Sequence, residues 1–464
     1  MFATSLAIRR RILGTGALVA GIFGFIATLL PIDSIALPLF ARQTGQNCVS
    51  CHAGGQFPEL TPYGRKFKLT GYTMGERATV PLALMGVVSS TRIDNTSTGV
   101  ASTDFPSNGK LEFTTMSVLC CGKITDNLGV FAQWTYDVYD HQNDQNRWVA
   151  LPHIDQFDMR YADRFIDANR DLIFGVSLNN NPTVSDVWNT HNNAFTPVPT
   201  YVPAANSVAT YAGAVPMDVA APYLEGEGQM AGGLTAYAFL NNSIYAEIGF
   251  YRNVRGALSF MNASHYDAIG YPSKMQGSNP YWRLAYNKDW GANSAMIGLH
   301  GMNADVYSDP TNTGSSIVKF RDVGIDGQYQ YILDPHVVTA MFSYTHEKQS
   351  YPTDQLGILA DNASNKLDYL RLKGTYVYQA KYGAALAYTS AKGSNDPTLW
   401  GSVSGVTDSR LWAPEVFWMP VQYVRVGLQY YKWTQFNGAK TNYDGNGRNA
   451  SDNNSLFFYV WGAY

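Results

Sequence analysis

The sequence predicts an all-β protein, a transmembrane antiparallel β-barrel of about 16 strands that follows a short, partly helical segment. Three observations support this fold class. Charged residues make up 15% of the 464 residues, against roughly 25% in soluble proteins, and aromatic residues make up 14%. The mean hydropathy is -0.18, and no run of about 18 apolar residues follows residue 30, which excludes a bundle of membrane helices. Many segments alternate apolar with polar residues, as barrel strands do.

The first 36 residues are expected to form a signal peptide. Three consecutive arginines precede a largely apolar stretch over residues 12–30. The small residues Ser34 and Ala36 then form an acceptable cleavage site, so the mature chain would begin at Leu37. An uncleaved anchor helix is the alternative, because the apolar stretch exceeds the usual signal core of about 7 to 15 residues. Both interpretations export the rest of the chain.

A c-type haem attachment motif follows the leader. Cys48, Cys51 and His52 have the C-x-x-C-H spacing, in which two thiols add to the porphyrin and the adjacent imidazole binds the iron. A disulfide between Cys48 and Cys51 or a zinc site are the alternatives, but zinc would need further close ligands, and the next cysteine is Cys120. We therefore expect one covalently attached haem c, with Cys48, Cys51 and His52 as its binding residues.

The second axial ligand of the haem iron is less evident from the sequence. Met74 is the expected distal ligand, and a methionine would raise the reduction potential relative to a histidine. An open sixth position is one alternative. Three other side chains are further alternatives: Met85, His141 and His153.

Residues 37–80 are expected to form the monohaem cytochrome c segment. Proline suits the first turn of a helix, so a short helix is expected near Pro62–Leu69. A segment of this length has too small a core to fold alone, so it should pack against the rest of the chain. Four basic residues could neutralise the haem propionates or form a solvated polar face: Arg42, Arg65, Lys66 and Lys68.

Residues 81–464 are expected to form the barrel. Period-two alternation is clearest in four stretches: 130–136, 244–251, 338–345 and 424–431. Short turn signals and long polar loops separate such stretches, and roughly 380 residues at about 10 per strand give about 16 strands. The lumen of such a barrel is too wide for side chains alone to fill, so the haem segment would fit inside it. The chain ends in an aromatic residue, Tyr464, as the closing strands of bacterial outer-membrane proteins do.

Two further cysteines, Cys120 and Cys121, are adjacent on an expected strand. Neighbouring strand residues point to opposite faces, and a disulfide between them would be strained. The sequence therefore favours two small, mostly apolar side chains at these positions over a disulfide.

Eight stretches carry a family resemblance: 40–45, 48–52, 57–68, 71–73, 125–127, 178–184, 188–190 and 449–454. In them the chain resembles the fused monohaem cytochrome and porin family of outer-membrane proteins known from iron-oxidising bacteria. The resemblance implies a haem that takes electrons from an extracellular reductant, usually Fe(II). The resemblance also implies that the haem passes these electrons to a periplasmic cytochrome or cupredoxin. The expected location is the lipid of the bacterial outer membrane, with the haem segment in the barrel lumen or on its periplasmic side.

Three functional classes follow from these features. The first is outer-membrane electron transfer with ferrous-iron oxidation. The second is an outer-membrane porin whose haem segment is a structural plug or a redox sensor. The third is a haem enzyme such as a peroxidase, for which His141, Asp137 and Asp140 could act as acid or base. The net charge of -3 argues against a nucleic-acid partner, because no basic excess is present to neutralise phosphates.

Overall fold

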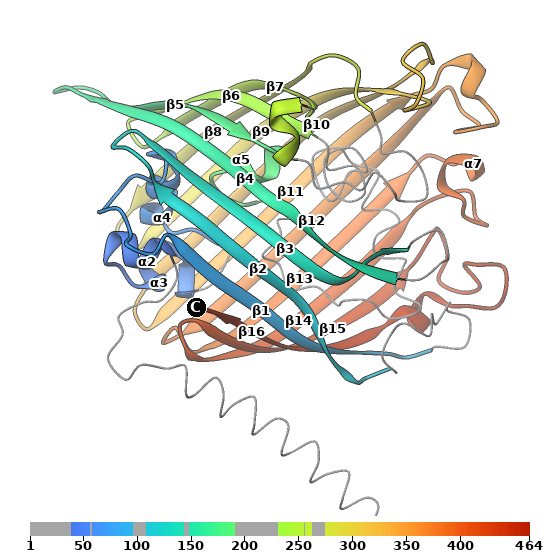
Figure 1. The fold of residues 1–464 in the computed structure, drawn as a ribbon. Coiled ribbons are helices and arrows are strands. Elements are labelled where there is room, and N and C mark those ends of the chain that lie inside the picture. Colours follow the sequence, from blue (N-terminus) through green and yellow to red (C-terminus); the bar gives the residue numbers. More distant parts are fainter. Residues whose placement is uncertain are drawn as a thin grey trace, which may run out of the picture.

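The computed structural model describes most of the chain, in these ranges: 39–55, 58–95, 108–142, 148–190, 231–254, 256–261 and 274–464. The signal peptide expected over residues 1–36 lies outside them. The described part of the chain begins with short helices and continues with long strands, as the sequence predicts (Figure 1).

The N-terminal segment is built from short helices and tight turns. They are α2 (Leu39–Thr44), α3 (Cys48–Cys51), η1 (Ala53–Gly55) and α4 (Pro62–Leu69). The bounds of α4 are those expected from the sequence, because Thr61 caps its first turn and a proline occupies the position that needs no main-chain donor.

Sixteen strands of the described residues follow, of which the first begins at Leu82. The strands are β1 (Leu82–Ile93), β2 (Leu111–Lys123), β3 (Leu128–Gln142), β4 (Trp148–Ile166), β5 (Asp171–Asn179), β6 (Ala231–Leu240), β7 (Ile244–Asn253), β8 (Asn279–Trp290), β9 (Asn293–Tyr307), β10 (Ile317–Leu333), β11 (His336–Ser350), β12 (Ser364–Tyr378), β13 (Tyr382–Gly393), β14 (Ser409–Val421), β15 (Val424–Gln435) and β16 (Ser455–Ala463). Short helices lie between some of them: α5 (Pro182–Ser185), η3 (Gly256–Met261), η4 (Thr353–Gln355), α7 (Pro397–Trp400) and η5 (Ala450–Asn453).

The strands form one closed antiparallel barrel. Each pairs with its neighbours in the sequence, and β1 pairs with β16 to close the ring, from Met85 opposite Ala463 to Ile93 opposite Ser455. The predicted fold class and the predicted number of strands are confirmed. Closure leaves no strand edge unpaired, which is the condition for a sheet to cross lipid.

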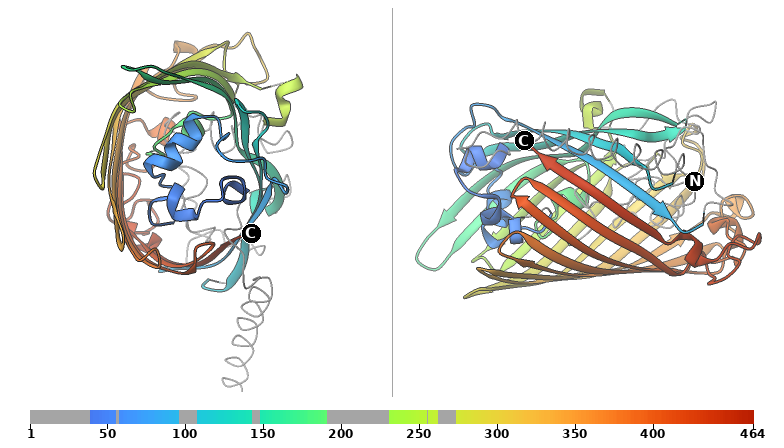
Figure 2. Two further views of the ribbon diagram at one scale, coloured as in Figure 1. Left: turned by 90° about the vertical axis from the view of Figure 1, so that its left-hand side faces the viewer. Right: turned by 90° about the horizontal axis from the view of Figure 1, so that it is seen from below.

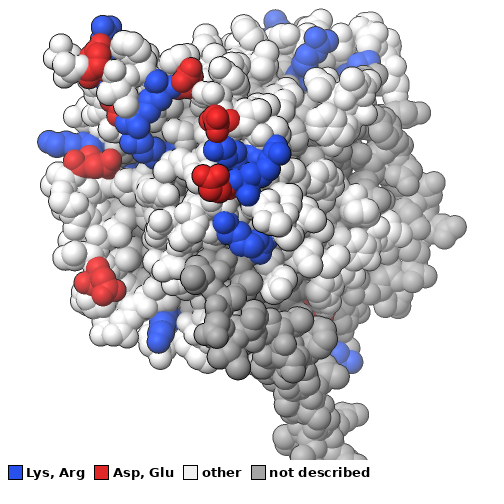
Figure 3. Space-filling model, turned by 60° about the vertical axis from the view of Figure 1, so that its left-hand side comes forward, with Lys and Arg blue, Asp and Glu red and all other residues white. Residues whose placement is uncertain are grey.

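The two faces of the strands are inverted relative to a soluble protein. On β7, Ile248 and Phe250 point outward and are 62% and 54% exposed, while Tyr245 and Glu247 point into the lumen and are buried. Figure 3 shows charged side chains gathered at one end of the barrel, beside a wall on which the described residues are mostly uncharged. An apolar outer wall with a polar interior is the pattern of a barrel in lipid.

Among the helices of the described ranges, none is both long enough and apolar enough to cross a membrane.

The two ends of the barrel differ in the length of their connections. The turn between β6 and β7 spans residues 241–243, whereas the loop between β9 and β10 spans 308–316. Helices α2, α3 and α4 lie inside the ring of strands at the end with the short turns (Figure 2). The N-terminal segment therefore occupies the lumen.

The expectation for Cys120 and Cys121 was wrong. The two residues form a disulfide, with Cα atoms 3.2 Å apart. Their shared peptide bond is cis.

Ile248→Arg is expected to lower the free energy of unfolding in lipid by about 2 to 4 kcal/mol, because it places a charge on the lipid-facing wall in the middle of β7. The control is Ala168→Arg, in the exposed turn between β4 and β5, for which a change below about 0.5 kcal/mol is expected. Equilibrium unfolding in urea, with the protein folded into phospholipid vesicles, measures both. Equal effects would contradict a lipid-facing position for Ile248.

Candidate haem-binding site

The haem attachment motif forms a compact turn at the end of the barrel. Cys48 and Cys51 are the first and last residues of α3, and His52 follows directly. His52 forms an isolated antiparallel bridge with Leu60, so the chain folds back on itself after the motif. This pairing fixes the main chain of the histidine next to the start of α4.

Helix α4 packs directly on the motif. Thr61 begins the helix, because its hydroxyl oxygen accepts a hydrogen bond from the main-chain N–H of Gly64 at 3.1 Å. The same hydroxyl donates to the carbonyl oxygen of Ser50. A Cβ atom on Gly64 would overlap the carbonyl oxygen of Cys51. The close contact between α4 and α3 therefore depends on a residue without a side chain at position 64.

An apolar cavity opens beside the motif. Both Cys51 and His52 line it. Most of the wall is apolar and comes from α2, α4, the barrel and the lumen: Leu39, Phe40, Phe67, Leu119, Phe131 and Val184. The cavity therefore suits a large, mainly apolar group attached at the motif.

The protonation states of the motif fit a haem ligand set. Burial lowers the pKa of His52 to about 3, so its imidazole is neutral at pH 7 and has the form that binds a metal. Cys48 and Cys51 are free thiols, and burial raises the pKa of Cys51 to about 11. Within the described ranges, no three His, Cys, Asp or Glu side chains are grouped so that they could hold a metal ion. The residues present fit a covalently attached porphyrin.

The far wall of the cavity comes from a segment whose role the sequence analysis missed. After β5, residues 180–190 fold into the lumen, where they include α5 and are almost entirely buried (Figure 1). Val184 and Asn189 line the cavity, and the Asn189 side-chain amide donates to the carbonyl oxygen of Pro58 at 2.7 Å. The one signal in the sequence was the family resemblance, which includes parts of this segment.

Arg65 joins α4 to the barrel wall. Its guanidinium donates to the side-chain carbonyl oxygens of Gln328 and Gln330, at 3.0 and 2.8 Å, and to the hydroxyl of Ser294 at 2.5 Å. These partners lie on β9 and β10. Burial lowers the pKa of Arg65 to about 10, which still leaves the group charged at pH 7. Arg65 therefore serves as an anchor to the wall.

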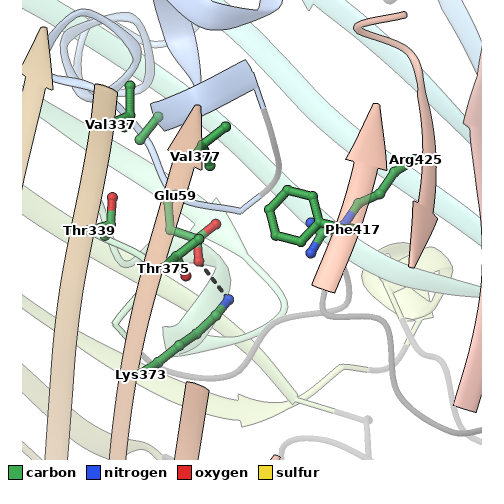
Figure 4. Close-up of a pocket in the computed structure, with 9 residues that line it drawn as sticks. Glu59, Val337, Thr339, Lys373, Thr375, Val377, Phe417 and Arg425 are labelled. Atoms are coloured by element: carbon green, nitrogen blue, oxygen red, sulfur yellow. Dashed lines mark hydrogen bonds and ion pairs between the residues drawn. The ribbon is translucent and has the colours of Figure 1, made fainter. Parts of the chain in front are cut away.

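Glu59 provides a second anchor, on β12. Its carboxylate accepts a hydrogen bond from the ammonium group of Lys373 at 2.6 Å, and both groups face a small cavity between the segment and the wall (Figure 4). The carbonyl oxygen of Glu59 accepts from the main-chain N–H of Ala53, the residue after His52. The loop that carries His52 is thereby held to the barrel by an ion pair.

The C-terminal end of α4 is joined to β4. Gly71 and Tyr72 have φ angles of 71° and 60°, and this left-handed turn reverses the chain. The ring of Tyr72 packs on Phe67, and its hydroxyl donates to the carboxylate of Asp158 at 2.5 Å. Asp158 forms a fully buried ion pair with Arg160. One side of the cavity is therefore tied to a charged pair in the barrel wall.

The candidates for the second axial ligand lie in different places. Met74 packs on the aromatic cluster beside the cavity but does not line the cavity itself. Met85 lies on β1 and packs against residues of β16. His153 is on β4, and the side chain of His141 lies outside the described part of the structure. Met74 as the distal ligand stays a prediction.

Of the four basic residues near the motif, Lys68 lines the apolar cavity. Arg42 donates to the carbonyl oxygen of Leu82, and Lys66 and Arg65 line a separate cavity on the other side of α4. Burial lowers the pKa of Lys68 to about 8, so the ammonium group remains mostly charged at pH 7. The structure thus separates Lys68 from the other three.

Comparisons with known proteins add structural likenesses of low similarity. No protein-family model matches the chain, and no curated protein sequence matches it. Among solved structures it is similar to OmpF of Salmonella typhi, with 12% identity, a TM-score of 0.45 and coverage of 82% of this chain and 97% of that chain. It is similar to the outer membrane channel DcaP of Acinetobacter baumannii with 10% identity, a TM-score of 0.42 and coverage of 84% of this chain and 99% of that chain. It is similar to the anion-selective porin from Comamonas acidovorans with 10% identity, a TM-score of 0.41 and coverage of 82% of this chain and 99% of that chain. At these values the likenesses carry no inference about activity.

Gly64→Ala is expected to reduce the haem bound per barrel and to destabilise the haem segment by about 1 to 3 kcal/mol, because the new methyl group overlaps the main chain of Cys51. The matched control is Gly374→Ala on β12, where an added Cβ meets no atom within 4 Å. Haem absorbance relative to protein absorbance measures the effect. Full haem loading of the Gly64 variant would contradict the close packing of α4 on the motif.

Proposed function

We propose that this chain is an outer-membrane electron-transfer protein that carries one covalent haem c on Cys48, Cys51 and His52. The haem takes electrons from an extracellular reductant, Fe(II), and passes them to a periplasmic cytochrome or cupredoxin. Fe(II) and the periplasmic carrier enter this proposal through the family resemblance of the sequence.

One observation carries the proposal. The C-x-x-C-H motif borders an apolar cavity inside the end of a membrane barrel, and its histidine is half-buried with a neutral imidazole. A haem attachment motif on an exposed loop would give the cofactor no such enclosure. Enclosure in apolar surroundings is one of the means by which proteins tune haem potential.

In this proposal, different residues of the chain attach the porphyrin, bind the iron and hold the motif in place. Cys48 and Cys51 hold the porphyrin covalently, and His52 supplies the proximal nitrogen ligand. When bound, the haem supplies a one-electron couple between Fe(III) and Fe(II). The closed barrel separates the cavity from lipid, while Arg65 and Glu59 keep the motif at a fixed place in the lumen.

The difference between the two ends of the barrel supports this direction of electron flow. Outer-membrane barrels have short turns on the periplasmic side and longer loops outside the cell. The haem segment lies at the end with the short turns, so the cavity would be within reach of a periplasmic carrier. The reductant would approach from the end with the long loops.

A second function, a porin with a plug or redox sensor, is favoured by a different observation. The hydrogen bonds of Arg65, Glu59 and Asn189 hold the segment in the lumen as a plug would be held. Measurable solute flux in a liposome assay would favour this second function. Turnover of hydrogen peroxide would instead favour a haem enzyme.

Cys51→Ala or His52→Ala is expected to abolish normal haem incorporation or ligation and to leave the barrel folded, because the sixteen strands pair without the motif. Visible absorbance measures the haem, and a mobility shift on heating before gel electrophoresis measures the barrel. As a control, Ser50→Ala changes the same turn and keeps all three motif residues. Wild-type haem absorbance in either motif variant would disprove this assignment.

Anaerobic addition of Fe(II) to the purified protein in detergent is expected to produce the sharp absorption bands of a reduced c-type haem. Dithionite, a strong reductant, serves as the positive control. Reduction by dithionite with no reduction by Fe(II) would leave a cytochrome and remove iron as the electron donor. An absence of c-type bands with both reductants would overturn the electron-transfer proposal itself.

A further inference from the structure

Helix α4 carries two lysines that differ in their surroundings. Lys68 is 8% exposed and lines the apolar cavity next to His52. Lys66, two residues earlier, is half-buried and faces the separate cavity with Arg65. The two side chains leave the helix about 200° apart, because each residue turns the helix by about 100°. Two cations on one short helix thus meet different environments.

Among the residues that the structure describes, the ammonium group of Lys68 has one hydrogen-bond acceptor, the carbonyl oxygen of Asp186 at 2.7 Å. Three carboxylates act on Lys68 through their charge, and one of them, Glu247, accepts a hydrogen bond from the hydroxyl of Tyr245. The other two pair with arginines. Asp158 pairs with Arg160 at 2.7 Å, and Asp186 pairs with Arg283 at 3.3 Å. Among the described residues, Lys68 forms no ion pair with any carboxylate. It is a buried cation that lines the cavity.

A buried ammonium group is stabilised by a carboxylate at hydrogen-bond distance, because burial removes the water that would otherwise solvate the charge. A ligand that suits this cavity therefore has a large apolar body and a carboxylate group. A haem has both, since its porphyrin is apolar and its two propionates are carboxylates.

We propose that Lys68 binds a propionate carboxylate of the haem and that its positive charge raises the reduction potential of the iron. This inference rests on the proposed function, because it requires a haem at Cys48, Cys51 and His52. It adds the residue that sets the potential. Lys68 is a positioning residue, since it acts on the iron through the propionate and through its charge.

The sign of the effect follows from electrostatics. Reduction adds one negative charge to the haem, and a nearby positive charge stabilises the reduced form relative to the oxidised form. The effect is larger in an apolar cavity than in water, because the effective dielectric constant is lower. Loss of the Lys68 charge should therefore favour Fe(III) and lower the potential.

The test compares variants of the full-length, haem-loaded protein. Lys68→Met removes the charge and keeps the length of the side chain, while Lys68→Gln removes the charge and keeps a donor for the carbonyl oxygen of Asp186. Lys66→Met is the matched control on the same helix. The midpoint potential of each is measured by optical redox titration at pH 6.5, with the ferric spectrum recorded alongside.

Both Lys68 variants should bind haem and show a lower midpoint. We expect at least about a tenfold fall in the equilibrium constant for reduction, which is about 59 mV for one electron. Lys66→Met should keep the wild-type midpoint. Equal shifts in the Met and Gln variants would assign the effect to the charge and not to the hydrogen bond with Asp186.

Three results would overturn the inference. The first is a wild-type midpoint in Lys68→Met and Lys68→Gln. The second is the same shift in Lys66→Met, which would point to net charge alone. The third is a changed ligand field in the ferric spectrum of both Lys68 variants, which would make Lys68 an iron ligand. Failure of the proposed function itself is distinguishable, because wild-type protein would then show no c-type bands.

Discussion

Pairing of the main chain in lipid is the constraint on which the rest of this structure depends. No water is available in a bilayer to satisfy an unpaired N–H or C=O group, so a sheet that crosses it must close on itself. Here closure takes sixteen strands and a pairing of β1 with β16. A ring of that size encloses more space than its own side chains fill. The N-terminal helices and residues 180–190 occupy part of that space at one end.

The site divides into a local part and a distant part. In the proposed function, the covalent chemistry would belong to five consecutive residues, Cys48 to His52, whose geometry is set by hydrogen bonds within the segment and by Gly64. Its surroundings come from elsewhere: Phe131 from β3, Val184 from the inward segment and Leu119 from β2. Surroundings of this kind control the polarity and solvent access of a cofactor as much as its direct ligands do.

Local rules predicted the parts of the structure that depend on neighbouring residues. Alternation in stretches such as 244–251 separated an outward from an inward face, and the preference of proline for a first helical turn located α4 near Pro62–Leu69. Residues 180–190 were not predicted as part of the site, because a largely polar stretch rich in Asn has the same composition whether it lies in solvent or in a wet lumen. Lys68 was one of four equivalent cations in the sequence, and only packing separates it from them.

The position of the haem segment has a consequence for the order of folding. Its contacts with the last strands join residues far apart in the chain: Cys48 to Gln422, 374 residues away, and Glu59 to Lys373, 314 residues away. The seam between β1 and β16 closes a loop of comparable length, and β1 begins only 13 residues after α4 ends. These long loops share the entropy of one closure, so once the ring is closed the contacts of the segment require little further loss of loop entropy.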